Sequence, residues 1–153
     1  MIKIVHHGIS EAEREALYNL LREPFGVVEM EDKVNESIMS SVYIEMPIRY
    51  DHGFIRVLGV DRWEGLKEIL KNMRWRRGKS DFMLTMNFKD KHANTIFIIE
   101  GSDHKVFNKA VEGIEYVVDT VYFNDARSMY GSGSNSSIVF EFNREDMRWY
   151  PRR

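Results

Sequence analysis

The sequence predicts an α+β fold: a mixed, mainly antiparallel sheet with three helices on one face, built from βαβ units joined by hairpins. The first observation is a motif in which an apolar run ends in glycine, one residue follows, and Ser or Asp precedes an amphipathic stretch. Glycine permits a tight turn, and Ser or Asp caps the free amides of a helix start. Each motif therefore predicts a strand that leads into a helix. The three motifs are Gly8-Ile9-Ser10, Gly59-Val60-Asp61 and Gly101-Ser102-Asp103.

The second observation is the regular alternation of apolar and polar residues in several segments. Between residues 41 and 50 every second residue is apolar, and residues 82–88 and 138–142 show a similar pattern. Strands with one apolar and one polar side are typical of a mixed or antiparallel sheet that helices cover on one face. Together with the βαβ units, this pattern favours a ferredoxin-like sandwich. The residues on the apolar side of the first segment are Val42, Ile44, Met46, Ile48 and Tyr50.

The three helices have recognisable starts and ends. Ser10 and Glu13 form a capping box at the start of the first helix, and Pro24 follows its last apolar residues. The second helix starts at the second motif and ends before Gly78. The third helix starts at the third motif, and we expect Gly113 to form its C-cap.

The strands lie between these helices. We expect hairpin turns at residues 51–53 and 89–94. Residues 117–123 are β-branched and aromatic, which favours a strand, and a longer third helix is the alternative there. The expected strands are residues 2–5, 27–30, 41–49, 54–58, 82–88, 95–99, 117–123 and 138–142.

Length and composition limit the classes of protein. We expect the 153 residues to form a single domain, with residues 144–153 as a flexible basic tail. The absence of cysteine excludes disulfides, thiol nucleophiles and zinc sites built on sulfur. The formal net charge of −2 argues against a globally basic nucleic-acid binder. Because the sequence has neither a signal segment nor an apolar span of about 20 residues, we expect a cytoplasmic protein without a membrane partner.

The helix starts suggest a site for a small anionic ligand. If the three strands that carry the motifs run in the same direction, the helix starts meet at one edge, where free amides and partial positive charge attract anions. The alternative is that Ser10, Asp61 and Asp103 already satisfy those amides and act as ordinary caps. The candidate residues are His6, His7, Ser10, Arg62, Ser102, His104 and Lys105.

A metal site is not expected. His6 and His7 are adjacent, and neighbouring residues on a strand point to opposite faces, so the two cannot easily share one ion. His104 is too distant in sequence to complete a recognisable ligand spacing. We therefore predict neither a metal nor a cofactor.

Two basic and aromatic clusters suggest a nucleic-acid partner. Arginine contacts phosphates and aromatic rings stack on bases, so such clusters can bind single-stranded RNA. The alternative is structural: basic residues are favoured in the last turn of a helix, and the neighbouring Trp can pack on the sheet edge. The candidate residues are Lys71, Arg74, Trp75, Arg76, Arg77, Lys79, Arg148, Trp149, Arg152 and Arg153.

The sequence holds no catalytic motif, and our first hypothesis is a non-catalytic binding or regulatory module that forms a homodimer. The first alternative is an RNA-associated protein that uses the two basic clusters. The second is a small enzyme at the helix-start edge, with His6 or His104 as acid or base. The polar side of the sheet fits a ligand platform, a dimer interface or a plain solvated surface, and its residues are Tyr43, Glu45, Arg49, Arg56, Thr85, Asn87 and Glu141.

Overall fold

A computed structural model describes residues 1–32, 39–91, 93–101, 103–121, 123–124 and 136–152 of the chain. The Ser102 and Arg153 candidates and the residues of the glycine- and serine-rich tract up to 135 lie outside these ranges. The described elements are β1 (Ile2–His7), α1 (Glu11–Leu21), β2 (Val27–Glu31), β3 (Ser40–Met46), α2 (Phe54–Leu58), α3 (Val60–Arg76), β4 (Phe82–Lys89), β5 (Ala93–Ile99), α4 (His104–Gly113), the 3-10 helix η1 (Ile114–Asp119), β6 (Ser136–Asn143) and β7 (Arg148–Pro151).

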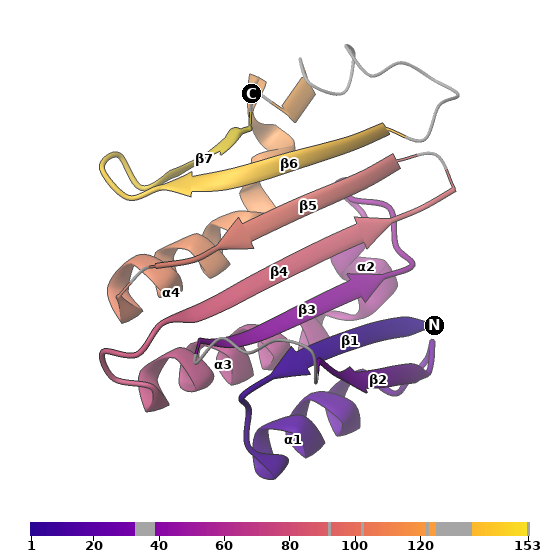
Figure 1. The fold of residues 1–153 in the computed structure, drawn as a ribbon. Helices are drawn as coiled ribbons and strands as arrows, with labels where there is room; N and C mark the ends of the chain where they lie inside the picture. Colours follow the sequence, from indigo (N-terminus) through magenta and orange to yellow (C-terminus); the bar gives the residue numbers. More distant parts are fainter. Residues whose placement is uncertain (33–38, 92, 102, 122, 125–135, 153) are drawn as a thin grey trace.

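The strands form one seven-stranded sheet in the order β2-β1-β3-β4-β5-β6-β7 (Figure 1). Three pairs, β1·β2, β3·β4 and β5·β6, are parallel, and β1·β3, β4·β5 and β6·β7 are antiparallel. The described sheet is therefore mixed, and the expectation of a mainly antiparallel sheet is wrong. The βαβ units are present, because a helix joins the strands of each parallel pair. The ferredoxin-like arrangement is not confirmed, and this strand order is unlike it.

The helices cover one face of the sheet, as the alternation predicts (Figure 1). One cross-strand row on this face is almost completely buried, and it packs Phe97 on Phe140 with ring centroids 5.3 Å apart. We call the other side the open face. No helix among the described residues is long and apolar enough to cross a membrane. The buried row consists of Ile4, Ile44, Met86, Phe97 and Phe140.

Two of the three motifs form the predicted turn and cap. Gly8 and Gly101 have φ angles of 66° and 61°, which glycine adopts without strain. Ser10 and Asp103 then accept hydrogen bonds from the amides of Glu13 and Val106, at 3.1 and 2.9 Å. The first and third motifs are therefore confirmed as strand, turn and helix cap.

The prediction from the second motif is wrong, because residues 54–58 form helix α2 and not a strand. Phe54 and Leu58 lie four residues apart on one buried side of this helix. The N-cap of α3 is Gly59, without a side-chain hydrogen bond, and Asp61 lies inside the first turn. The expected hairpin at residues 51–53 is therefore absent; α2 and α3 instead carry the chain from β3 to its parallel neighbour β4.

Residues 117–123 also differ from the expected strand. Ile114–Asp119 form η1, which continues from α4, so the alternative of a longer helical segment is closer to the structure. The buried hydroxyl of Tyr50 donates to the Ile114 carbonyl and accepts from the Val118 amide at 3.0 Å, which fixes η1 to the core. Gly113 has a φ of −79°, so it is not a left-handed cap.

The basic tail forms an ordered strand along part of its length. Arg148–Pro151 form β7 and pair with β6, which corrects the expectation of a flexible tail for these residues. Trp149 anchors the strand, since its Nε1 donates to the Ala110 carbonyl at 2.9 Å. Gly113 leaves room for this ring, because a Cβ there would lie 3.3 Å from it.

Candidate functional site

The helix starts do not share one end of the sheet. β1 and β5 run in the same direction, so α1 and α4 start at the same end, whereas α3 follows the oppositely directed β3 and starts at the far end (Figure 1). Arg62, in the first turn of α3, is therefore remote from Ser10 and His104, and the expectation of a common edge is wrong for this residue. The last turn of α3 lies instead at the end where α1 and α4 begin.

The histidines of β1 point to opposite faces, as the sequence predicts. His6 is buried on the helix-covered face, and His7 is half-buried with its Nδ1 3.2 Å from the Asp32 carbonyl oxygen. Two described pockets are lined by neither His6 nor His104. In the described part of the chain, no three His, Asp or Glu side chains are placed to hold a metal ion.

Glu13 joins the start of α1 to the end of α3. The Arg77 guanidinium donates to both carboxylate oxygens, at 2.7 and 2.9 Å, and the Ser10 amide donates to Oε1 at 2.9 Å. Burial alone would raise the pKa of Glu13, but the hydrogen bonds from Arg77 and Ser10 outweigh it and lower the pKa to about 2. The sequence identified the capping box and missed the ion pair, because the two partners lie 64 residues apart.

Arg74 also has a structural role. Its side chain is buried, and Nη2 donates to the carbonyls of Gly78 and Ser80 at 2.7 and 2.6 Å. Arg77 similarly donates to the Met73 carbonyl at 2.8 Å. These contacts satisfy carbonyls at and beyond the C-terminus of α3. They support the structural alternative for Arg74 and Arg77.

Trp75 lies outside this structural set. Its side chain is 67% exposed. The indole and the imidazole of His104 meet edge to face, with ring centroids 4.9 Å apart and an interplanar angle of 87°. This contact unites the basic cluster of α3 with the helix-start residues of α4. Exposed cations flank the pair along the chain. We call this set the Trp75 edge, and its residues are Trp75, Arg76, Lys79, His104 and Lys105.

Lys71 belongs to the contact between α3 and α4. It pairs with Glu112, and beside it the buried Lys67 binds Glu115 and Glu112 at 2.8 and 3.0 Å. Burial alone would lower the pKa of Lys67, but its hydrogen bonds to Glu115 and Glu112 outweigh this effect and raise it. Lys71 therefore holds the two helices together.

The C-terminal candidates are arranged differently. Trp149 is 5% exposed and packs against Phe97, so its ring is not available for stacking on a base. Arg148 is exposed, and Arg152 pairs with Glu141 at 2.5 Å on the open face. β7 also lies three positions from β4 in the sheet, so this cluster is separate from the Trp75 edge (Figure 1).

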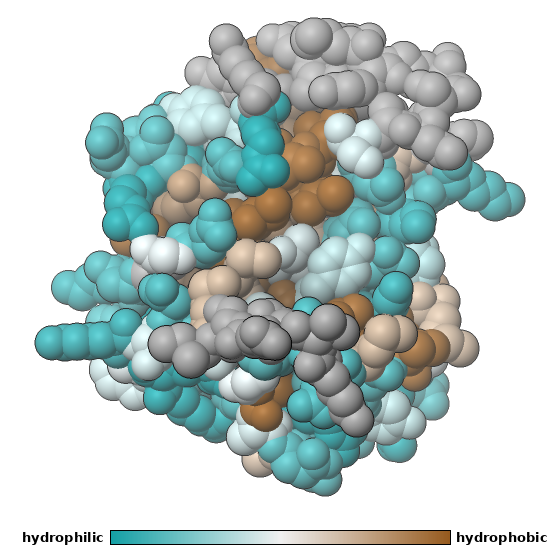
Figure 2. Space-filling model, in the orientation of Figure 1, coloured by the Kyte–Doolittle hydropathy of each residue, from teal (hydrophilic) through white to brown (hydrophobic). Residues whose placement is uncertain are grey.

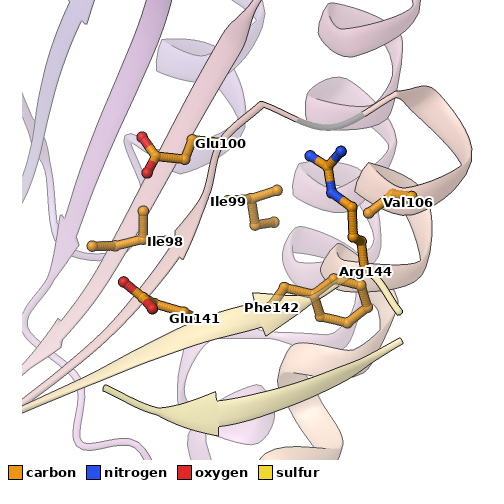
Figure 3. Close-up of a pocket in the computed structure, with 7 residues that line it drawn as sticks. All are labelled: Ile98, Ile99, Glu100, Val106, Glu141, Phe142 and Arg144. Carbon is orange, nitrogen blue, oxygen red and sulfur yellow. The ribbon is translucent and has the colours of Figure 1, made fainter. Parts of the chain in front are cut away.

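A pocket of about 180 Å³ lies at the carboxyl ends of β5 and β6 (Figure 3). The carboxylates of Glu100 and Glu141 lie on one side of it and the guanidinium of Arg144 on the other. Arg144 donates to the Gly101 carbonyl. Because the two carboxylates repel anions, the pocket does not extend the Trp75 edge as an anion site.

Comparison with protein-family models, with curated proteins and with solved structures finds no match to this chain.

Proposed function

We propose that this chain is a non-catalytic binding module that holds single-stranded nucleic acid on the Trp75 edge. The observation that carries the proposal is the exposed indole of Trp75, with its neighbouring cations. An exposed Trp beside positive charge offers a base a flat apolar surface and offers a phosphate a counter-charge.

Base stacking supplies the first part of the interaction. The edge-to-face contact with His104 limits how the indole of Trp75 can turn. A base that stacks on an aromatic side chain contributes about 1–3 kcal/mol to binding and needs no specific sequence. The geometry therefore supports binding of an unpaired nucleotide.

The flanking cations supply the second part. Arg76 and Lys79 extend from the end of α3, and Lys105 lies in the first turn of α4. Arg76 approaches Glu13 at 3.5 Å but keeps most of its side chain in water, so it can also contact a phosphate. Because the chain as a whole has a net charge of −2, binding must depend on these local charges and weaken as salt increases.

Tryptophan fluorescence tests the proposal directly. Trp63 and Trp149 are buried, so a stacked base should quench only Trp75. A mixed-sequence oligonucleotide of about 8 nucleotides should quench the emission at about 50 mM salt, with affinity falling steeply on salt addition. Trp75→Leu should abolish the quenching and weaken binding of the labelled oligonucleotide by about tenfold or more.

Matched lysine variants separate this edge from general charge. Lys79→Gln should lower the number of counterions released on binding by about one, which is read from the slope of log affinity against log salt concentration. Lys89→Gln removes the same charge at the opposite end of β4 and should leave binding unchanged. A free mononucleotide, used in parallel, distinguishes a nucleotide pocket from a strand-binding surface. Absence of quenching by the oligonucleotide at low salt, or equal effects of the two lysine variants, would overturn the proposal.

A further inference from the structure

A second exposed aromatic ring lies at the far end of α4 from the Trp75 edge. Tyr116, in η1, is 63% exposed, close to the 67% of Trp75, whereas Tyr18 on α1 is 37% exposed. Trp75 contacts His104 in the first turn of α4, and η1 continues from the last turn of that helix. The two most exposed Tyr or Trp rings among the described residues therefore lie at opposite ends of one helix.

Tyr116 lines a pocket of about 360 Å³, which we call the Tyr116 pocket. One wall is a side of α4 and η1, from Lys109 to Thr120, and the opposite wall comes from β6, β7 and the turn between them. Val117 and Phe142 supply apolar surface. The volume lies in the range of small-ligand sites, about 300–1,000 Å³, and an exposed ring beside apolar walls suits the flat face of a base.

Two lysines lie between the rings. Lys105, Lys109, Glu112 and Tyr116 follow one another at intervals of three or four residues, so they share one side of the helix. Lys105 and Lys109 are exposed, and neither forms an ion pair with the described residues. They can therefore contact the phosphates of a strand whose bases reach the two rings.

The acidic group on this side of α4 is bound by other residues. Glu112 pairs with Lys71 and, at 3.0 Å, with Lys67, and both lysines lie on α3. The charged residues that line the Tyr116 pocket are Lys109, Glu112 and Arg148, which are two cations and one carboxylate. The pocket therefore favours an anion such as a phosphate over a cation.

The two acids of η1 are also bound. Glu115 accepts hydrogen bonds from Lys67 at 2.8 Å and from the Trp63 Nε1 at 3.2 Å, and Asp119 Oδ1 lies 2.7 Å from His52 Nε2. The contacts of Glu115 hold it against α3, whereas the Tyr116 pocket lies between α4 and β7. Thus η1 presents no unpaired carboxylate to a phosphate at the pocket.

The open face of the sheet is less suited to a strand. Figure 2 shows an apolar band over β5 and β6 in the view onto this face. The described tyrosines of this face, Tyr43 and Tyr150, are half-buried, and their hydroxyls donate to Glu45 and Asp146. A base on either ring would bring its phosphate close to a carboxylate, which repels it. The side of α4 therefore provides the better path.

The distance between the rings sets the length of strand that can reach both. His104 and Tyr116 are about 18 Å apart along the axis of α4 and η1, at about 1.5 Å per residue. Nucleotides stacked about 3.4 Å apart need about six units to cover this distance. Folds that bind single strands hold about 4–16 nucleotides, so this length is ordinary for such a surface.

We infer that one nucleic-acid strand runs from the Trp75 edge along α4 and places a second base in the Tyr116 pocket. This path rests on the proposed function of the Trp75 edge and adds a second stacking ring to it. Lys105 and Lys109 contact the phosphates between the two bases. A strand too short to span α4 cannot occupy both rings at once.

Oligonucleotide length tests this path on the full chain. Mixed-sequence strands of about 3 and about 8 nucleotides are compared at about 50 mM salt, the shorter by quenching of Trp75 and the longer by the anisotropy of an end label. Tyr116→Leu should weaken binding of the longer strand by about tenfold, because one stacking contact is lost, and should leave quenching by the shorter strand unchanged. Lys109→Gln should lower the number of counterions released by the longer strand by about one.

Tyr18→Leu is the matched control, since Tyr18 is an exposed tyrosine on α1, which α3 separates from α4 (Figure 1). It should leave both affinities unchanged, and circular dichroism checks that each variant is folded. Equal binding of the longer strand by Tyr116→Leu and Tyr18→Leu, or an unchanged salt slope in Lys109→Gln, would overturn the path and leave the proposed function in place. If neither strand quenches Trp75 in the wild-type chain, the proposed function fails and the path fails with it.

Discussion

The two basic and aromatic clusters have similar compositions and opposite arrangements. At the end of α3, Trp75 is exposed while Arg74 and Arg77 contact the protein. On β7, Trp149 is buried while Arg148 points to solvent. Composition thus indicates that a cluster is basic and aromatic, but not which of its side chains faces the solvent. Of the two clusters, the one at α3 combines an exposed ring with exposed cationic side chains.

Secondary structure produces this difference. In the last turn of a helix, Arg74 and Arg77 lie three residues apart and can both reach the carbonyls at the helix end, which leaves Trp75 on another side. In a strand the side chains alternate, so burial of Trp149 turns its two neighbours outward. The same residue types therefore leave an exposed ring at the end of α3 and pack a ring into the core on β7.

The largest expected difference between the clusters is in their tryptophans. Trp149→Ala removes a buried ring and its hydrogen bond to Ala110, and it should lower the free energy of unfolding by about 3–5 kcal/mol. Trp75→Ala should change it by less than about 0.5 kcal/mol, because the ring is mostly in water. Urea unfolding followed by circular dichroism measures both. Similar losses in the two variants would show that Trp75 is a core residue.

The second prediction concerns the pH dependence of the ion pair between Arg77 and Glu13. The folded pKa of Glu13, about 2, is below its ordinary value of 4.5, so the charged form stabilises the fold. This contribution of about 3 kcal/mol is complete above pH 4.5 and is lost as the pH falls towards 2. Glu13→Gln should remove this contribution at neutral pH, so its free energy of unfolding should fall less between pH 4.5 and about 2. Glu15→Gln, an exposed change in the same helix, should show the same fall as the wild-type chain. Urea unfolding at a series of pH values measures the difference.

Much of the fold follows from local pattern, and the errors have physical reasons. The strict alternation from residue 41 identified β3, because a period of two is typical of a strand, but the strand ends at Met46, and Tyr50 is buried beyond its end. Residues 54–58 are five mostly apolar residues, which fit a short helix and a strand equally well. β7 has one buried residue among four, Trp149, and its pairing with β6 decides its conformation.

The candidate site could be predicted from the sequence only in part. Trp75 and His104 were each selected from the sequence, for different hypotheses, but no local pattern indicates that they touch across 29 residues of chain. Their meeting depends on the direction of α3, which in turn depends on whether residues 54–58 form a strand or a helix.

The third prediction compares neighbouring arginines of the α3 cluster. Arg74→Met removes the guanidinium that donates to the carbonyls of Gly78 and Ser80, and it should lower the free energy of unfolding by about 1–3 kcal/mol. Arg76→Met should change stability by less than about 0.5 kcal/mol, because its side chain is mostly exposed. Oligonucleotide binding should show the reverse order, with the folded Arg74→Met variant binding normally. If Arg74→Met reduced binding at a temperature where it is fully folded, Arg74 would belong to the interface.

The smallest effect is expected on β7. Arg152→Gln breaks the exposed ion pair with Glu141 and should lower the free energy of unfolding by about 0.2–1 kcal/mol, a difference that disappears at high salt because mobile ions screen it. The loss in Arg74→Met should persist at high salt, since its partners are carbonyls of the backbone. Salt thus separates the two kinds of arginine, and urea titrations with and without about 1 M sodium chloride measure the difference. A salt-independent loss in Arg152→Gln would mean that the guanidinium packs on the sheet instead of pairing in water.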